Sequence, residues 1–255
     1  MKEIKPWLLL AIIFYLLFLG WSFPAERALS FLYNRQVISP ATISIADPSG
    51  SWSSGKAPYV RAGNIVIKNL SWSFQPASLL LGRLQFAVKG EIMANRISCR
   101  LSFDSNTFTV KNLNGTLPAD TAIRPYLPGI NLGGSLAADR VSLTIEKGFL
   151  QKASGQISWK EAALGSPYNT PLGGLSLALS TEENEITIKL NDLGGPLQAD
   201  GLGFISPAGE YSYNGWVSAS RESSPDLASF LQILGAPQAD GKIKLDLKGK
   251  LPRLF

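Results

Sequence analysis

The chain has 255 residues, of which 45% are hydrophobic and 17% charged, so it has ample material for a buried core and is not disordered by composition. Its formal net charge of +5 comes from lysines and arginines scattered singly along the chain. Because basic runs with interleaved aromatic side chains are missing, we expect no nucleic-acid partner. We interpret the positive excess as a contribution to solubility and to attraction by nearby anionic lipid headgroups.

The residue types needed for common catalytic chemistry are poorly represented. The sequence has no histidine, which removes the commonest general base and the commonest metal ligand and rules out a Ser-His-Asp arrangement. The aspartates lack the spacing of a calcium-binding loop. Cys99 is the single cysteine, and it falls in phase with the apolar residues Ile97 and Leu101, which predicts a small core-facing side chain. We therefore predict no enzyme activity and no metal or cofactor.

The first element in chain order is an apolar segment. Residues 7–23 (WLLLAIIFYLLFLGWSF) carry no charge and reach the lower limit of length for a transmembrane helix. Trp7 and Trp21 lie near its two ends, where aromatic side chains favour the membrane interface. The alternative is a cleaved signal peptide, but the run is long for one and no small-residue cleavage site follows it. Lys2 and Lys5 favour a cytoplasmic N-terminus for residues 1–6, so the rest of the chain is expected across the membrane.

Residues 24–40 form the expected membrane-proximal linker. Within it, residues 25–36 (AERALSFLYNRQ) place apolar side chains at helical spacing, with Arg27 and Arg35 available to lipid phosphates. A short helix leaving the bilayer and a packed connector remain equally open here.

From residue 41 to residue 255 the hydrophobic pattern has a period of two. Alternation such as Leu84, Phe86 and Val88 against polar or small neighbours predicts strands with one apolar and one polar face, hence an antiparallel sheet. Gly, Asn, Asp and Pro separate these runs at regular intervals, as in a meander. One later helix is also predicted, because Ser224 is a good N-cap, Pro225 suits the first helical position and Gly235 follows the end. A weaker helical turn is expected near residues 119–126.

The fold predicted is thus all-β with one N-terminal transmembrane helix and one short C-terminal helix. A sheet of ten or more strands must twist, curl or close, so we expect a large curved antiparallel sheet, either a half-open groove or a barrel-like sandwich. Its apolar stripe is either a filled core or a channel for an apolar ligand, and both readings stay open. The candidate groove or core residues are Trp72, Phe86, Leu101, Phe103, Leu143, Trp159, Ile188 and Leu245.

Several segments resemble a known family. Residues 71–84 (SWSFQPASLLLGRL) resemble the "Trp, then Pro, then Leu-Leu-x-Gly" segment of the type II secretion system protein N family. Residues 155–160 (GQISWK), 190–201 (LNDLGGPLQADG), 209–215 (GEYSYNG) and 224–241 resemble the same family in the same order.

This resemblance implies an inner-membrane component of the bacterial machine that moves folded proteins across the outer membrane, with its bulk in the periplasm. It also implies a curved sheet of the AsmA-like kind, which has been linked to lipid handling. The first hypothesis is a non-catalytic accessory scaffold that binds other secretion components through sheet edges or the outer face. The second is a lipid-binding or lipid-transfer protein whose trough holds phospholipid chains, and the third is an envelope protein that braces the membrane without a specific ligand.

Overall fold

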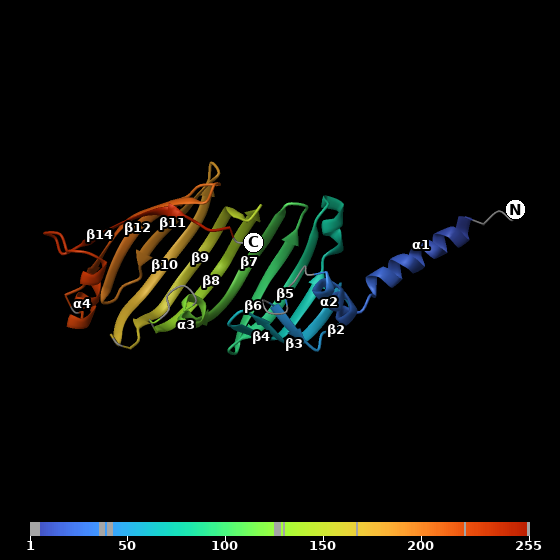
Figure 1. Ribbon diagram of the computed structural model, residues 1–255, viewed down its shortest axis with the longest axis horizontal. Helices are drawn as coiled ribbons and strands as arrows, with labels where there is room; N and C mark the ends of the chain where they lie inside the picture. Colours follow the sequence, from blue (N-terminus) through green and yellow to red (C-terminus); the bar gives the residue numbers. More distant parts are fainter. Residues whose placement is uncertain are drawn as a thin grey trace.

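A computed structural model describes residues 6–35, 39, 43–124, 129, 131–166, 168–221 and 223–253. Its body is one 14-stranded antiparallel sheet in which the strands follow one another in chain order, apart from the two-residue β2, which pairs with β3. Figure 1 shows this meander running from β3 and β4 at one end to β14 at the other. The sheet is open, since β1 and β14 lie at its two edges. The all-β prediction is confirmed.

The strands alternate apolar and polar side chains, as the sequence predicts. Their bounds are β1 (Ile43–Ala46), β2 (Ser49–Gly50), β3 (Ser54–Ala62), β4 (Ile65–Phe74), β5 (Leu84–Ile92), β6 (Asn95–Phe103), β7 (Thr107–Pro118), β8 (Leu132–Glu146), β9 (Phe149–Leu164), β10 (Thr170–Glu182), β11 (Glu185–Asp192), β12 (Leu197–Ile205), β13 (Glu210–Ala219) and β14 (Ile243–Lys250).

Helices are few and short in the described residues. They are α1 (Pro6–Trp21), α2 (Ala25–Asn34), the 3-10 helix η1 (Pro76–Leu81), α3 (Ala119–Ile123) and α4 (Pro225–Leu234). Helix α4 begins as predicted, because the Ser224 side chain accepts a hydrogen bond from the backbone N–H of Leu227 and Pro225 takes the first helical position. For residues 25–36 the sequence allows either a short helix or a packed connector, and the structure has a helix from Ala25 to Asn34.

The expected membrane segment 7–23 coincides with α1, which has 16 residues. Within the described ranges, no helix has both the length and the apolar character needed to span a bilayer. Lys2 and Lys5 lie outside the described residues, as do residues 36–38 and 40–42 at the expected junction of linker and sheet.

One end of the apolar face is covered by α3 and α4. Leu227 and Leu231 of α4 are almost completely buried, and they belong to a cluster with Ala119 of α3 and apolar side chains of β8, β9, β10, β12, β13 and β14. This contact buries Leu227 and Leu231 of the amphipathic α4, whereas its polar residues and also Ile233 and Leu234 remain exposed.

A second apolar cluster marks a bend in the sheet. Ala153, Ile186 and Ile205 are buried by neighbouring strand residues and by Leu251, and no helix contributes to this cluster. Strands β9 and β11 approach within 8 Å between Cα atoms, as do β10 and β12, although neither pair is adjacent in the sheet. In a flat sheet such strands are separated by about 9.6 Å. The sheet therefore curls here with its apolar face on the inside.

The opposite end of the sheet is joined to α1 by aromatic packing. The Trp21 ring packs edge-on against Phe74 with ring centres 5.6 Å apart, and Trp52 packs against both rings. The Trp52 indole N–H donates to the Gly20 carbonyl at 2.7 Å, and the Ser53 hydroxyl donates to the Trp21 carbonyl at 3.0 Å. The carboxyl end of α1 is thus fixed beside the end of β4.

Candidate functional site: a basic pocket on the polar face

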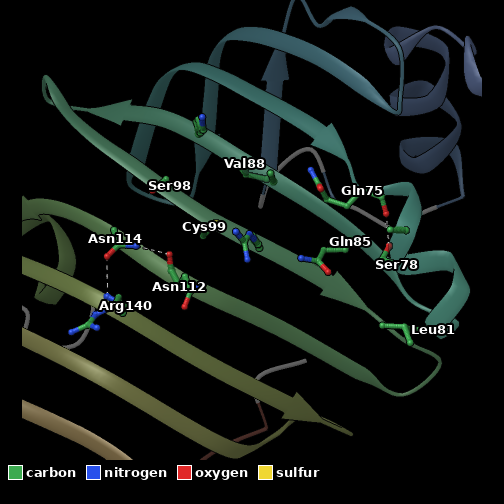
Figure 2. Close-up of a pocket in the computed structure, with 14 residues that line it drawn as sticks. Gln75, Ser78, Leu81, Gln85, Val88, Ser98, Cys99, Asn112, Asn114 and Arg140 are labelled. Atoms are coloured by element: carbon green, nitrogen blue, oxygen red, sulfur yellow. Dashed lines mark hydrogen bonds between the residues drawn. The ribbon is translucent and has the colours of Figure 1, made fainter.

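A hollow with a volume of about 880 Å³ lies on the polar face of the sheet, beside η1. Figure 2 shows its walls, with Gln75, Ser78 and Leu81 from the η1 region on one side and β5 to β8 beneath. The residues that line it are Gln75, Ala77, Ser78, Leu81, Gln85, Ala87, Val88, Lys89, Ser98, Cys99, Arg100, Asn112, Asn114 and Arg140. These include three cations and four amides but no acidic side chain, which is the chemistry of an anion-binding surface.

The cations gather because the strands pair in a fixed register. Lys89 of β5 lies opposite Ser98, and Ala87 lies opposite Arg100 of β6, so Lys89 and Arg100 are diagonal neighbours on one face. Arg100 in turn lies directly opposite Lys111 of β7. Side chains directly opposite each other have Cβ atoms about 5 Å apart, and like charges in that position are destabilising. Lys89, Arg100 and Lys111 therefore form a row of positive charge across three strands, which we call the basic row.

Carboxylates do not neutralise the basic row. Among the described residues, none has a carboxylate oxygen within 4.0 Å of the charged nitrogens of Lys89, Arg100 or Lys111. Arg140, at the far side of the pocket, lies 3.4 Å from the Asp139 carboxylate, but both side chains are largely exposed and this pair is weak. The pocket thus keeps a net positive charge that favours an anionic partner.

Two β-bulges shape the floor of the pocket. Asn112 in β7 and Arg140 in β8 have positive φ angles of 51° and 48°, and each marks a shift in register. The freed backbone groups are paired, since the Asn112 N–H donates to the Ser142 hydroxyl and the Arg140 N–H donates to the Asn114 side-chain oxygen at 2.9 Å. The Asn114 amide donates to the Asn112 carbonyl at 2.8 Å. These hydrogen bonds hold the bulges in one conformation and turn local side chains toward the pocket.

Cys99 borders this pocket and is half-buried, where the sequence pattern predicts a core-facing residue. Burial raises the pKa of its thiol, so the protonated form is favoured. In the described part of the chain, no three residues among Cys, Asp and Glu lie close enough together to hold a metal ion.

The sheet also brings together most of the predicted groove or core residues. Phe86, Leu101 and Leu143 lie in one row on the apolar face, joined through Val110, and Trp72 and Phe103 lie two residues further along their strands. The three other candidate residues lie on later strands. Ile188 packs on the cluster at the bend, and Trp159 and Leu245 pack on the cluster under α4. Whether this stripe is a core or a ligand channel stays a prediction.

The two tryptophans predicted to anchor the membrane segment differ in their exposure. Trp7 is 78% exposed on α1, whereas Trp21 is partly covered by the aromatic contacts with the sheet.

Comparison with known proteins identifies the family. The model of the family "Type II secretion system (T2SS), protein N" matches residues 41–246, which is most of the chain. The chain belongs to the type II secretion system protein N family. A curated relative, "Type II secretion system protein N" of Pectobacterium carotovorum subsp. carotovorum, is 24% identical over 131 residues, which cover 49% of this chain and 51% of the relative. The aligned part thus spans about half of that relative's length. No solved structure matches the chain significantly.

The part of the chain that matches the family includes the basic row, η1 and the buried residues of both apolar clusters. Single-sequence reasoning missed the basic row because it treated the cations as scattered. The overlooked signal is their spacing, since residues 89, 100 and 111 are separated by 11 residues each time. In a meander whose hairpins repeat at that interval, such residues become neighbours.

Proposed function

We propose that this protein is a non-catalytic, inner-membrane accessory component of the type II secretion system, with the sheet on the periplasmic side. The observation that carries the proposal is the family match, which extends over nearly the whole sheet. The non-catalytic part rests on the histidine-free sequence, which cannot form the usual acid–base and nucleophile arrangements.

The proposed anchor is α1. Its exposed large side chains are apolar in every direction, including Trp7, Phe14, Tyr15 and Phe18, and a helix of that kind needs an apolar environment such as a bilayer. Lys2 and Lys5 support a cytoplasmic N-terminus. Because the carboxyl end of α1 is tied to β4 by Trp21, Trp52 and the Gly20 carbonyl, the anchor would hold the sheet close to the membrane surface.

The proposed contact with other secretion components is the free edge of β14. This strand pairs with β13 on one side, and its outer edge carries backbone groups available for strand addition. Lys244, Lys248 and Lys250 lie along β14, where charge discourages non-specific edge pairing and favours an acidic strand.

Deletion and complementation test this role. In a host that carries the gene, deletion is expected to reduce the amount of type II substrates in the medium, and the full-length chain is expected to restore it. A variant with Lys244→Glu and Lys248→Glu would repel an acidic strand from the edge of β14 without replacing a core residue, and it is expected to complement poorly while still accumulating in the membrane. Unchanged secretion after deletion would contradict the proposal.

A second candidate function is phospholipid binding in the apolar trough, as the AsmA-like resemblance implies. One observation favours it: over β5 to β8 the apolar face is only half-covered, with Leu101, Phe108 and Val110 partly exposed and Leu84 and Phe103 more than 40% exposed. Mass spectrometry of the detergent-purified protein would detect bound phospholipid in stoichiometric amount. Lipid at trace level only would contradict this candidate.

A further inference from the structure

Three consecutive leucines project into solvent from η1. Leu80 is 90% exposed, Leu81 73% and Leu79 52%. Single exposed apolar residues are common on protein surfaces, but a contiguous apolar patch indicates an interaction site. Leu84 and Phe103, which pair directly across β5 and β6, are also exposed, but their side chains lie on the apolar face of the sheet, the face opposite to the basic row.

The leucines are held outward by a well-defined turn. Pro76 opens η1, and the Ser78 hydroxyl donates to the Gln75 carbonyl at 2.6 Å. Gly82 ends it in the left-handed region, with φ of 67°, and its N–H donates to the Leu79 carbonyl at 2.9 Å. The Arg83 N–H donates to the Ser78 carbonyl at 3.1 Å. Because these contacts fix the backbone, the leucines cannot turn back onto the sheet without breaking them.

The leucine patch adjoins the basic row. Leu81 lines the same pocket as Lys89 and Arg100, and Figure 2 shows Leu81 at the margin of that pocket. Apolar side chains that enter the interfacial zone of a bilayer, next to cations that meet lipid phosphates, are the combination that binds an anionic membrane. A partner that offers only acidic groups would neutralise the cations but leave the leucines exposed, whereas a phospholipid surface offers both phosphates and an apolar interior.

The position of η1 agrees with this partner. Helix η1 begins two residues after Phe74, whose ring packs on Trp21 at the end of α1. Figure 1 shows η1, the teal helix, at the same end of the sheet from which α1 extends. A bilayer that holds α1 would therefore lie close to η1.

We propose that the η1 leucines and the basic row form a second membrane contact, in which the leucines enter the bilayer interface and Lys89, Arg100 and Lys111 bind the phosphates of anionic phospholipids. This inference rests on the proposed anchoring of α1 in the inner membrane. The contact would fix the tilt of the sheet over the membrane, which α1 alone leaves free.

Depth-dependent quenching tests this contact in the full chain. A Cys99→Ser background carries one cysteine, at Leu80→Cys or at Met93→Cys, labelled with bimane. Met93 is also exposed, but it follows β5 at the end opposite η1, about 30 Å away along the strand. The protein is reconstituted in liposomes of phosphatidylethanolamine and phosphatidylglycerol (7:3) or of phosphatidylcholine alone, each with nitroxide-labelled lipid. We expect several-fold stronger quenching at position 80 than at position 93, and only in the anionic liposomes.

Charge variants test the basic row. Each cation near an anionic surface strengthens binding about fivefold, so Arg100→Glu with Lys111→Glu is expected to lower quenching at position 80 to the level at position 93. Lys189→Glu, which makes the same charge change on an exposed residue of β11, is the matched control and should leave quenching unchanged. If the double variant misfolds, raising the salt to about 0.5 M should have the same effect on the unaltered row, because salt screens exposed charges.

Equal quenching at positions 80 and 93 in anionic liposomes would overturn the inference, and equal quenching at position 80 in both lipid mixtures would overturn the role of the basic row. Failure of the liposomes to retain the chain after alkaline carbonate extraction would overturn the proposed anchor itself. Retention without quenching at position 80 would overturn only the second contact.

Discussion

Replacing Tyr213 by phenylalanine is expected to stabilise the protein, contrary to the usual effect of mutating a buried residue. The Tyr213 ring lies over the backbone of Gly201, Gly203 and Gly215, where added Cβ atoms would collide with the ring or its hydroxyl. The hydroxyl oxygen has almost no contact with solvent and, in the described structure, no hydrogen-bond partner. A buried polar group without a partner costs about 1–3 kcal/mol.

We take the lower end of that range, because the residue as a whole is only half-buried, and expect Tyr213→Phe to raise the free energy of unfolding by about 1 kcal/mol. Urea denaturation of the detergent-solubilised protein, followed by tryptophan fluorescence, would measure the change. Tyr59→Phe is the matched control, since Tyr59 is 55% exposed and should change stability by less than about 0.5 kcal/mol.

The effect of Tyr213→Phe on the free energy of unfolding is also expected to depend on pH. Burial, and then the charge of Asp200, raise the pKa of Tyr213 above its ordinary value of 10.0. The folded state therefore keeps the proton longer than the unfolded state, so this residue's contribution is intact below about pH 10 and is lost as the pH rises further. The advantage of Tyr213→Phe over the unaltered protein should grow above that pH. A loss of stability in Tyr213→Phe near pH 7 would mean that the Tyr213 hydroxyl makes a favourable hydrogen bond, contrary to this expectation.

Three further changes have clear expectations. Leu227→Ala should lower the free energy of unfolding by about 3 kcal/mol in urea titrations, because Leu227 is fully buried between α4 and the sheet. Ser224→Ala should cost about 1 kcal/mol in the same assay by removing the N-cap of α4, whereas Ser229→Ala, on its exposed side, should cost less. Cys99 in the folded protein should react with iodoacetamide at pH 8 at least about tenfold more slowly than in urea, as followed by mass spectrometry.

Each of these has a contrary result. A Leu227→Ala cost below about 1 kcal/mol would mean that α4 is not seated on the sheet. Equal costs for the two serine variants would remove the capping argument, and equal alkylation of Cys99 in the folded and unfolded states would show that its thiol is open to solvent.

Local patterns predicted the elements of this fold well. Helix α4 follows from Ser224, Pro225 and Gly235, because capping and proline geometry involve residues that are adjacent in sequence. The strands follow from alternation, since the period of two is set by the backbone itself.

Features that depend on pairing between strands were not predictable in this way. The bulges at Asn112 and Arg140 arise from registers that join β6, β7 and β8, and neither residue is a glycine that would have marked a positive φ angle. The basic row needs the same registers, since its residues come from three strands. The exposure of Leu79 to Leu81 was also hidden, because a Leu-Leu-Leu run in a sequence usually indicates core.

If this chain works in the type II secretion apparatus, as we propose, its contacts with other secretion-system proteins can be trapped by photo-crosslinking in living cells. A photo-reactive amino acid is placed at Lys244 or Lys248 on the edge strand β14, and at Leu143 or Ile188 on the apolar face as the matched interior positions. After irradiation of living cells, adducts are identified by mass spectrometry. We expect other secretion-system proteins to be captured from the edge positions and not from the interior ones. Capture of no secretion-system protein from Lys244 or Lys248, with phospholipid alone captured at Leu143 and Ile188, would contradict it.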